Sequence, residues 1–576
     1  MEDALADIED VVEGDVRGSR PPTVARRVQA ASAEAERDAA RDSGVPGTAR
    51  VWMKTFGCAH NVSDSEFMAG QLQEQGYSLT EEACAADLWL LNTCTVKNPS
   101  QSAMDTVLAA GRAQGKALLV AGCVPQGERD AAALEGLSLL GVTQIDRVCE
   151  AVAETLRGNT VRLLQRKALP ALDLPKLRRN AHVEILPLST GCLGSCTYCK
   201  TVHARGKLGS YSLEALLSRA RAAVADGVAE IWLSSEDTGA YGLDIGTNLS
   251  ALLAALVEVL PPDGRTMLRL GMTNPPYMLD QLEAVAAALN HPCVYSVIHI
   301  PVQSGSNAVL GAMNREYTIQ EFRRCVDALL ERVPGLNVCT DVICGFPGET
   351  DADFQETLEL VSHYRFPVVN ISQFYPRPGT LAARMPKLPS QTVKARSRAL
   401  TALHESYAPH EGLVGTTQRA WFTALAADGV QLAGRTKGGV QVLVAPRAGL
   451  LGCSATVRVT AAGRWSVSAE LVEVLEAHAL PALSSAHSAD CAAPARSAES
   501  TAENSASCCG GEACSSAQTV APVMKEAVVA LRAAPKMRTV LPVGDWAEVA
   551  LWSGVALGLT GVLAAGLTHL WALRAS

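Results

Sequence analysis

The sequence predicts an α/β protein with two parallel-sheet domains, a small C-terminal β-barrel and one C-terminal transmembrane helix. Three observations support this prediction. Short runs rich in Val, Leu and Ile alternate with Ala/Leu-rich helical stretches from Ala49 to Glu411, which is the pattern of βα units. Val-rich runs broken by Gly follow from Gly412 to Val474. A stretch without Asp, Glu, Lys or Arg, Val549–Leu573, lies near the end of the chain.

Changes in composition predict where one segment ends and the next begins. The first residues are Ala-rich and mixed in charge, without a clear apolar face, and a later stretch is rich in Ser and Ala. The predicted segments are a disordered tail (1–48), a first βα domain (49–164), a connector (165–182), a second βα domain (183–411), a β-barrel (412–474), a flexible linker (475–545) and a membrane anchor (546–574).

Charge and cysteine content narrow the class of protein. The acidic start "MEDALADIEDVVEG" lacks the apolar core of a secretory signal. The 17 cysteines are therefore expected to stay reduced and able to bind metal. The net charge of −9 argues against a generally basic nucleic-acid binder, although local basic patches remain possible.

Three cysteines of the first domain occupy equivalent positions. Cys58, Cys94 and Cys123 each follow directly after an apolar run that predicts a parallel strand. Carboxyl ends of parallel strands share one edge of a sheet, so we expect these thiols to converge. Three thiolates suit an iron–sulfur cluster or an open metal site, whereas isolated buried cysteines are the alternative. His60, Asn61 and Ser63 follow Cys58. They are expected to cap the next helix or to line the site, and capping is the favoured role.

A second set of cysteines opens the second domain. "TGCLGSCTYCK" places Cys192, Cys196 and Cys199 in a C-x3-C-x2-C pattern after the predicted strand "VEILPLS". A closed zinc site needs a fourth ligand, for which His203 is a formal candidate. A [4Fe–4S] cluster held by three thiolates is the simpler interpretation, because its fourth iron stays open to a substrate or cofactor.

Polar residues follow the later predicted strands of this domain. With "VEILPLS" the domain has six such strands, and the functional groups of barrels collect at their carboxyl ends. Some of these residues are expected only to cap helices. They are Glu236 and Asp237, Thr273 and Asn274, Gln303 and Ser304, Thr340 and Asp341, and Tyr375 and Arg377.

The cysteine motifs resemble a known family. C-x3-C-x2-C with Tyr198 before the third cysteine resembles the radical S-adenosylmethionine (SAM) superfamily. "KTFGCAHNVSDSE", "LLNTCTV" and "AGC", followed by "HIPVQSGSNAVLGAMNREY", "TDVICGFPGETD" and "QFYPRPGT", resemble the methylthiotransferases of that superfamily. Residues 412–474 are positioned like the family's RNA-binding TRAM barrel. "SEDTGAYG", "LRLGMTNPPY" and the hydrophobic end resemble its eukaryotic tail-anchored branch.

This resemblance implies a fold, cofactors and a reaction. The second domain is then a partial (βα)6 radical-SAM barrel, and each cysteine triad holds a [4Fe–4S] cluster. The branch converts N6-threonylcarbamoyladenosine, next to the tRNA anticodon, into its 2-methylthio derivative. One SAM supplies the 5′-deoxyadenosyl radical and another the methyl group, with an electron donor and a sulfur source as further partners. Candidate SAM contacts are Tyr198, Glu236, Asn274 and Gln303.

Basic residues are the candidates for tRNA contacts. Phosphate binding needs only local patches, even in an acidic protein, although most charged residues form solvated faces. The candidates are Arg205, Arg377, Arg419 and Lys437.

The last hydrophobic segment is predicted to be a tail anchor. Val549–Leu573 is long enough to span the bilayer, and Trp546, Trp552 and Trp571 lie near its ends. A buried core helix is the alternative. The family branch implies the endoplasmic reticulum membrane with the bulk of the chain in the cytosol; the mitochondrial outer membrane is not excluded by the residues.

Three other functions remain open at the level of sequence. The chain is alternatively a methylthiotransferase of another tRNA adenosine or of a ribosomal protein, an inactive membrane-tethered RNA-binding protein, or a zinc protein. The six cysteines at cluster positions count against the second alternative.

Overall fold

The computed structural model describes residues 49–95 and 98–475. The predicted N-terminal tail, the membrane anchor and all of the linker except Leu475 lie outside these residues. Within the described ranges, no helix is both long enough and apolar enough to cross a bilayer.

The first domain contains a six-stranded parallel sheet with the order β2-β1-β3-β4-β5-β6. This confirms the predicted N-terminal parallel-sheet domain. The strands are β1 (Arg50–Thr55), β2 (Ser78–Thr80), β3 (Leu88–Thr93), β4 (Ala117–Gly122), β5 (Ser138–Leu140) and β6 (Arg162–Leu163). The helices are α2 (Ala59–Glu74), α3 (Asn98–Ala113), α4 (Cys123–Gly127) and α5 (Val148–Leu156).

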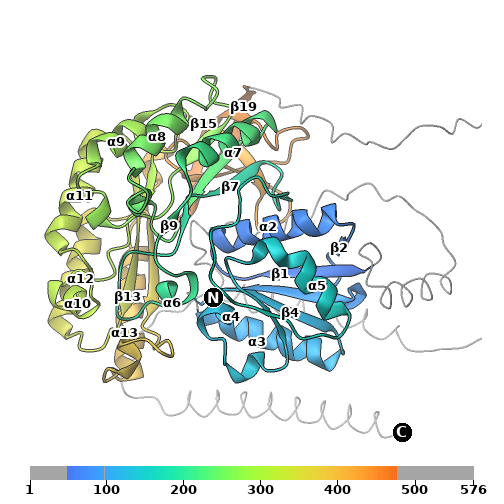
Figure 1. Cartoon of the computed structure of the whole chain (residues 1–576). Helices are drawn as coiled ribbons and strands as arrows, with labels where there is room; N and C mark the ends of the chain where they lie inside the picture. The colour runs from blue at the N-terminus through green and yellow to red at the C-terminus, as the bar shows by residue number, and fades with distance from the viewer. Residues whose placement is uncertain (1–48, 96–97, 476–576) are drawn as a thin grey trace, which may run out of the picture. The chain divides into compact units, whose positions relative to one another are not determined.

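Helices cover both faces of this sheet (Figure 1). Alternate residues of β3 point to opposite faces, as the pleat requires. Leu88 and Leu90 join the apolar cluster that contains residues of α2 and α5. Trp89 and Leu91 join a second cluster with residues of α3. Both faces being apolar explains why these strands appear in the sequence as continuous hydrophobic runs.

The second domain is a partial barrel of six parallel strands. They form two three-stranded sheets, β7-β10-β11 and β12-β13-β14. A parallel bridge between Leu268 and Val294 joins the halves, and the Thr273 amide donates to the His299 carbonyl at 3.0 Å. The strands are β7 (Val183–Pro187), β10 (Glu230–Ser234), β11 (Met267–Arg269), β12 (Val297–His299), β13 (Asn337–Cys344) and β14 (Val368–Gln373).

Helices follow the strands of this barrel. Local sequence signals begin several of them: Thr318 and Thr350 each form a capping box with the acidic residue three positions later. The helices are α6 (Thr201–Arg205), α7 (Leu213–Ala225), α8 (Leu249–Val257), α9 (Leu282–Asn290), α10 (Asn307–Ala312), α11 (Ile319–Arg332), α12 (Asp351–Tyr364) and α13 (Ser390–Glu405). A short ribbon of β8 (Ser189–Thr190) and β9 (Gly209–Ser210) precedes α7.

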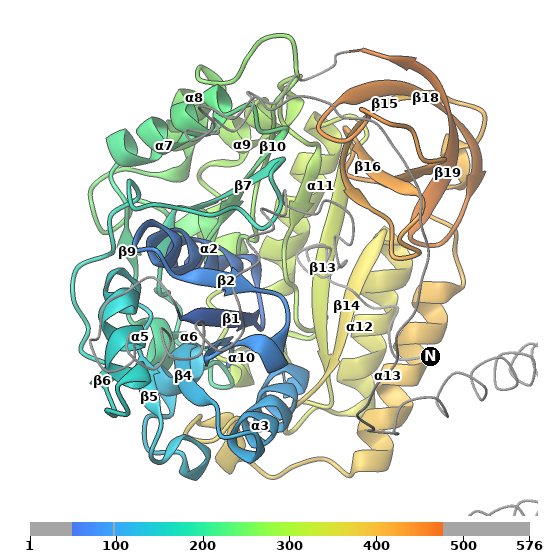
Figure 2. The same cartoon turned by 90° about the vertical axis from the view of Figure 1, so that its right-hand side faces the viewer.

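The C-terminal domain is a closed barrel with the strand order β15-β16-β17-β19-β18 (Figure 2). This confirms the predicted small β-barrel. The strands are β15 (Thr417–Leu425), β16 (Leu432–Thr436), β17 (Gln441–Val444), β18 (Ser454–Ala462) and β19 (Ser466–Val474). Trp421 of β15 donates to the Gly264 carbonyl at 2.8 Å and packs edge-on against Tyr295, so this barrel is attached to the second domain.

The connector fastens the first domain to the second. Lys176 is fully buried and its ammonium lies 2.8 Å from Glu184 of β7 and 3.3 Å from Glu66 of α2. Arg178 and Arg219 also pair with Glu184, and these cations lower its pKa to about 2 against the opposing effect of burial. The basic connector therefore neutralises buried carboxylates where α2 meets the barrel.

Candidate functional site

The structure places the first cysteine triad at one edge of the N-terminal sheet. Cys58 follows β1, Cys94 follows β3, and Cys123 begins α4 directly after β4. These three strands are neighbours in the sheet. Cys94 and Cys123 are buried and Cys58 is half-buried. The convergence expected from three strand ends is therefore present in the fold.

Two glycines allow the backbone to approach these cysteines closely. Gly57 has φ +102°, and a Cβ there would lie 2.3 Å from Cβ of Cys94. Gly122 has φ +92°, and a Cβ there would lie 2.3 Å from Oδ1 of Asn92. Only glycine combines this backbone conformation with such short approaches.

Asn61 holds the segments of the first triad together. Its Nδ2 donates to the carbonyl oxygens of Phe56 at 2.8 Å and of Thr93 at 3.1 Å, which precede Cys58 and Cys94. The thiol of Cys123 lies 3.7 Å from its Oδ1. The expectation of helix capping was wrong for this residue, because Cys58 is the N-cap of α2 and no side chain caps it.

The second triad lies in the loop between β8 and α6. A Cβ at Gly194 would lie 3.7 Å from Sγ of Cys192 and 3.9 Å from Sγ of Cys196, so the two thiols flank this glycine. The Thr197 amide donates to the Met313 carbonyl at 2.9 Å, which attaches the loop to the end of α10. All three cysteines of this triad are half-buried.

Arg315 contacts the second triad and is the main residue that sequence analysis missed. Its Nη1 donates to Sγ of Cys196 at 3.2 Å, its Nε donates to the Tyr317 hydroxyl at 3.2 Å, and its Nη2 donates to Oδ1 of Asn274. A signal existed in the motif "NAVLGAMNREY", but one arginine in a long motif does not reveal which loop it meets.

Two consecutive carboxylates after β10 serve different triads. Glu236 lies 3.1 Å from Nδ1 of His60 and 3.1 Å from Nε of Arg205, close to the first triad. Burial raises the pKa of Glu236, but the interactions with His60 and Arg205 outweigh it and lower that pKa. Asp237 accepts from Nδ2 of Asn274 at 2.7 Å, close to the second triad. Burial raises the pKa of Asp237 to about 6, against the opposing hydrogen bonds from Asn274.

The four candidate SAM contacts lie in different surroundings. Glu236 belongs to the network of the first triad, as described. Asn274 bridges Asp237 and Arg315 beside the second triad. Tyr198 is buried against Phe346, with ring centroids 6.3 Å apart. Gln303 is buried with φ +66°, and none of the residues that the structure describes forms a hydrogen bond with its side-chain amide. A non-glycine residue in this conformation is a frequent mark of a functional position.

The candidate phosphate-binding residues are mostly engaged within the protein. Lys437 donates to Leu289 O, Val294 O and the Ser296 hydroxyl, so its three ammonium hydrogens are used. Arg419 donates to Asp263 O at 3.1 Å and lies over the ring of Trp421. Both residues therefore take part in the contact between the two barrels, and their contact with RNA stays a prediction.

The other two candidates lie beside the cysteine triads. Arg377 is half-buried and donates to the backbone carbonyl of Tyr198 at 3.1 Å. Arg205 is only 6% exposed, and its guanidinium contacts Asn61, Asp64 and Glu236. We therefore assign Arg205 to the first triad.

The protonation state of the thiols bears on metal binding. His203, the formal fourth ligand of a zinc site, is exposed on α6. Within residues 49–95 and 98–475 no group of three His, Cys, Asp or Glu side chains is arranged to hold a metal ion. Burial raises the pKa of Cys123 and of Cys192 to about 12, so metal binding must displace their protons.

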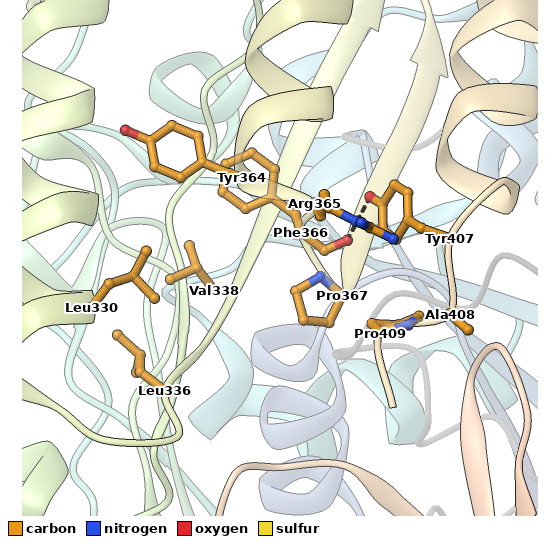
Figure 3. A pocket seen from close by; sticks show the side chains of 10 residues that line it. All are labelled: Leu330, Leu336, Val338, Tyr364, Arg365, Phe366, Pro367, Tyr407, Ala408 and Pro409. Carbon is orange, nitrogen blue, oxygen red and sulfur yellow. Dashed lines mark hydrogen bonds between the residues drawn. The ribbon is translucent and has the colours of Figure 1, made fainter. Parts of the chain in front are cut away.

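A separate pocket of about 330 Å³ lies in the second domain, and none of the six cysteines of the two triads lines it (Figure 3). Its walls combine apolar and aromatic side chains with the charged Arg365, and they include Val338 of β13, Phe366 before β14 and Tyr407, whose hydroxyl donates to the Phe366 carbonyl at 2.8 Å. The pocket is at the amino ends of these strands. That end of a barrel serves stability, so we assign it no part in the reaction.

Two family models match the chain. Residues 50–138 match "Uncharacterized protein family UPF0004", and residues 186–361 match "Radical SAM superfamily". The first range contains Cys58, Cys94 and Cys123, and the second contains the C-x3-C-x2-C loop. Each cysteine triad therefore falls within its own family match.

Curated proteins resemble the chain over most of its length. A threonylcarbamoyladenosine tRNA methylthiotransferase from Drosophila melanogaster is 52% identical over 440 residues, covering 75% of this chain and 79% of that protein. The one from Homo sapiens is 48% identical over 477 residues, covering 80% and 82%. A solved radical SAM methyltransferase, TsrM from Kitasatospora setae, has a TM-score of 0.42 at 14% identity, covering 56% of this chain and 72% of that chain, too low a similarity to carry an argument. The chain belongs to the threonylcarbamoyladenosine tRNA methylthiotransferases, a family of radical SAM enzymes.

Proposed function

We propose that this chain converts N6-threonylcarbamoyladenosine next to the anticodon of tRNA into its 2-methylthio derivative, using two SAM molecules and two [4Fe–4S] clusters. The observation that carries the proposal is the pair of thiol triads, one at the carboxyl edge of each parallel sheet, each surrounded by its own polar network. The family match supports the reaction, the tRNA substrate and SAM.

Cys192, Cys196 and Cys199 would hold one cluster and Cys58, Cys94 and Cys123 the other. When bound, a cluster with one open iron supplies an electron and a binding position for SAM at the second triad, and a binding position for sulfur at the first. Each triad supplies three thiols. Oε2 of Glu236, close to the first triad, is buried and has no hydrogen-bond partner among the described residues. Three thiols plus an unpaired polar atom fit a cofactor-binding site.

The residues around the second triad fix the orientation of its polar side chains and would offset the negative charge of a ligating thiolate. Arg315 donates to Sγ of Cys196 and so offsets the negative charge that a ligating thiolate carries. Asn274 is fixed between Asp237 and Arg315, which leaves its orientation determined before any ligand arrives. Tyr317 holds the other side of the guanidinium. Tyr317 is buried, and Arg315 and Asn274 are half-buried, so bulk water has restricted access and the electrostatic interactions at this site are stronger than in water.

We also propose that residues 546–574 anchor the protein in the endoplasmic reticulum membrane, with the other domains in the cytosol. The support is the uncharged stretch Val549–Leu573, the tryptophans near its ends and the resemblance to the tail-anchored branch. Deletion from Trp546 onward is expected to release soluble, active enzyme. Carbonate-resistant membrane association of the truncated protein would contradict this assignment.

The substrate is tested by nucleoside mass spectrometry. In a strain that lacks the gene, the 2-methylthio derivative of threonylcarbamoyladenosine should disappear from tRNA and return on complementation. Persistence of that nucleoside would favour another methylthiotransferase substrate. Absence of iron and sulfide after anaerobic reconstitution would instead favour an inactive RNA-binding protein.

A further inference from the structure

Helix α6 connects the two cysteine triads. It begins two residues after Cys199 and ends at Arg205, whose side chain enters the network around the first triad. Lys200 at its start pairs with Glu128, the residue that ends α4. Ala204 packs with Cys123 in one small apolar cluster. This five-residue helix therefore follows the second triad directly along the chain, and its side chains contact residues of the first triad and its surroundings.

The guanidinium of Arg205 reaches both domains. Its Nη2 donates to Oδ1 of Asn61 at 2.6 Å and to Oδ2 of Asp64 at 2.7 Å, both on α2. Its Nε lies 3.1 Å from Glu236, and its Nη1 donates to Thr190 at 3.4 Å, both in the barrel domain. The fork geometry of arginine allows four such partners at once, which an ammonium group cannot match.

The Arg205 network is packed and leaves no room for a ligand of its own. The cavity at this position has a volume of only about 10 Å³ and is lined by His60, Asp64 and Arg205 among others. Asn61, the partner of Arg205, is fully buried and holds the backbone before Cys58 and before Cys94. Whatever fixes Asn61 consequently fixes the spacing of those two cysteines.

We propose that Arg205 is a positioning residue for the first triad, acting through Asn61, so that this triad is ordered for its cluster only when α6 of the barrel is docked. The proposal rests on the proposed function, in which the first triad holds a cluster. The proposal goes beyond the proposed function because the order of the first triad would depend on Arg205, a residue of the second domain. Asp64 and Glu236 balance the guanidinium charge and keep it in place.

The first experiment needs no cluster. Backbone hydrogen exchange of the full-length apo protein is measured by mass spectrometry for wild type, Arg205→Gln, Arg205→Lys and Arg166→Gln. Arg166 is the matched control, because it also binds α6, at the Val202 and His203 carbonyls, but from the exposed side. Arg205→Gln should speed exchange about tenfold at the segments around Cys58 and Cys94, with Arg166→Gln unchanged there. Equal protection of these segments in Arg205→Gln and wild type would overturn the proposal.

The second experiment uses the reconstituted protein. The same variants are made in a Cys192→Ala background, which keeps only the first triad intact, and in a Cys58→Ala background, which keeps only the second. Arg205→Gln should weaken iron retention against a chelator about tenfold in the first background only, as loss of an outer-shell partner does. Its cluster should also take a more negative reduction potential, because a buried positive charge is lost, and Arg205→Lys should restore most of that potential.

The outcomes separate the two claims. If wild type never holds iron on the first triad but exchange still responds to Arg205→Gln, the proposed function fails and the positioning role stands. If Arg205→Gln lowers iron retention equally in both backgrounds, the residue only stabilises the whole fold and the positioning role is overturned.

Discussion

The two cysteine triads bring three thiols together in different ways. The second triad occupies one loop of eight residues, so its spacing is set by neighbouring residues along the chain. The first triad is collected from three strand ends between Cys58 and Cys123, and Asn61 has to tie the segments together. A local site depends on its loop, whereas a distributed site depends on the register of a whole sheet.

Each triad also carries one arginine, in different electrostatic settings. Arg205 at the first triad is paired with Asp64 and Glu236. Arg315 at the second triad contacts a thiol, a phenol and an amide, and no carboxylate within the described ranges lies at ion-pair distance from it. The charge of Arg315 therefore remains available to a bound anionic group, whereas the charge of Arg205 is balanced by the carboxylates of Asp64 and Glu236.

The largest expected difference separates the chemical roles of the triads. Cys192→Ala should abolish cleavage of SAM to 5′-deoxyadenosine, because the open iron that binds SAM requires this triad. Cys58→Ala should retain that cleavage and lose the methylthio product. Liquid chromatography with mass spectrometry measures both compounds in one assay. Formation of the methylthio product by Cys58→Ala would remove the distinction between the two sites.

A smaller effect is expected from the arginine of the second triad. Arg315→Gln should slow SAM cleavage about 10- to 100-fold, the usual cost of losing an outer-shell contact to a metal ligand. Iron bound to the first triad, measured in a Cys192→Ala background, should not change. Arg323→Gln is the matched control, since Arg323 lies over the Tyr364 ring away from both triads. An equal loss of rate in both variants would contradict the role of Arg315.

The glycines sharpen the contrast between a distributed and a local site. Gly57→Ala should lower the free energy of unfolding of the apo protein by about 2–4 kcal/mol, because φ is positive and the new Cβ would overlap Cys94. Gly194→Ala should change it by less than about 0.5 kcal/mol, because the new Cβ meets only ordinary contacts at 3.7 and 3.9 Å. Urea denaturation measures both values, and a similar cost for the two changes would refute the comparison.

The smallest effect is a pH dependence specific to the second triad's network. The pKa of Asp237 is raised by burial from 3.8 to about 6, so its protonated form favours the folded state below pH 3.8 and that contribution is lost as pH rises through 6. The Asp237→Asn variant has no such pH-dependent contribution, because an amide does not titrate. The difference in unfolding free energy between variant and wild-type apo protein should grow between pH 4 and pH 7, towards about 3 kcal/mol. A difference independent of pH would show that Asp237 titrates normally.

Sequence reasoning succeeded where the signal is local or periodic. The continuous hydrophobic runs predicted both parallel sheets, because strands buried on two faces are apolar throughout. The Val-rich runs broken by Gly predicted the small barrel. C-x3-C-x2-C is a spacing within one loop and can be seen without the fold. The convergence of Cys58, Cys94 and Cys123 also followed from sequence, since each cysteine directly follows a strand.

Sequence reasoning was weaker for charged residues. Three basic residues suggested phosphate contacts, and in the structure each donates hydrogen bonds to other residues of the protein. They are Arg205, Arg419 and Lys437. Arg315 was missed although it contacts the thiol of Cys196. A charged side chain carries no periodic signal, so its partner is known only once distant segments are brought together.

The amino-acid sequence by itself determined the domain types, the two thiol triads and the family chemistry, because these depend on patterns along the chain. Only the tertiary structure decided which arginine serves which triad, that Glu236 and Asp237 turn to different sites, and that α6 joins them. The physical reason is that burial and hydrogen-bond partners arise from contacts between residues far apart in sequence, and Arg205 and Asn61 are 144 positions apart.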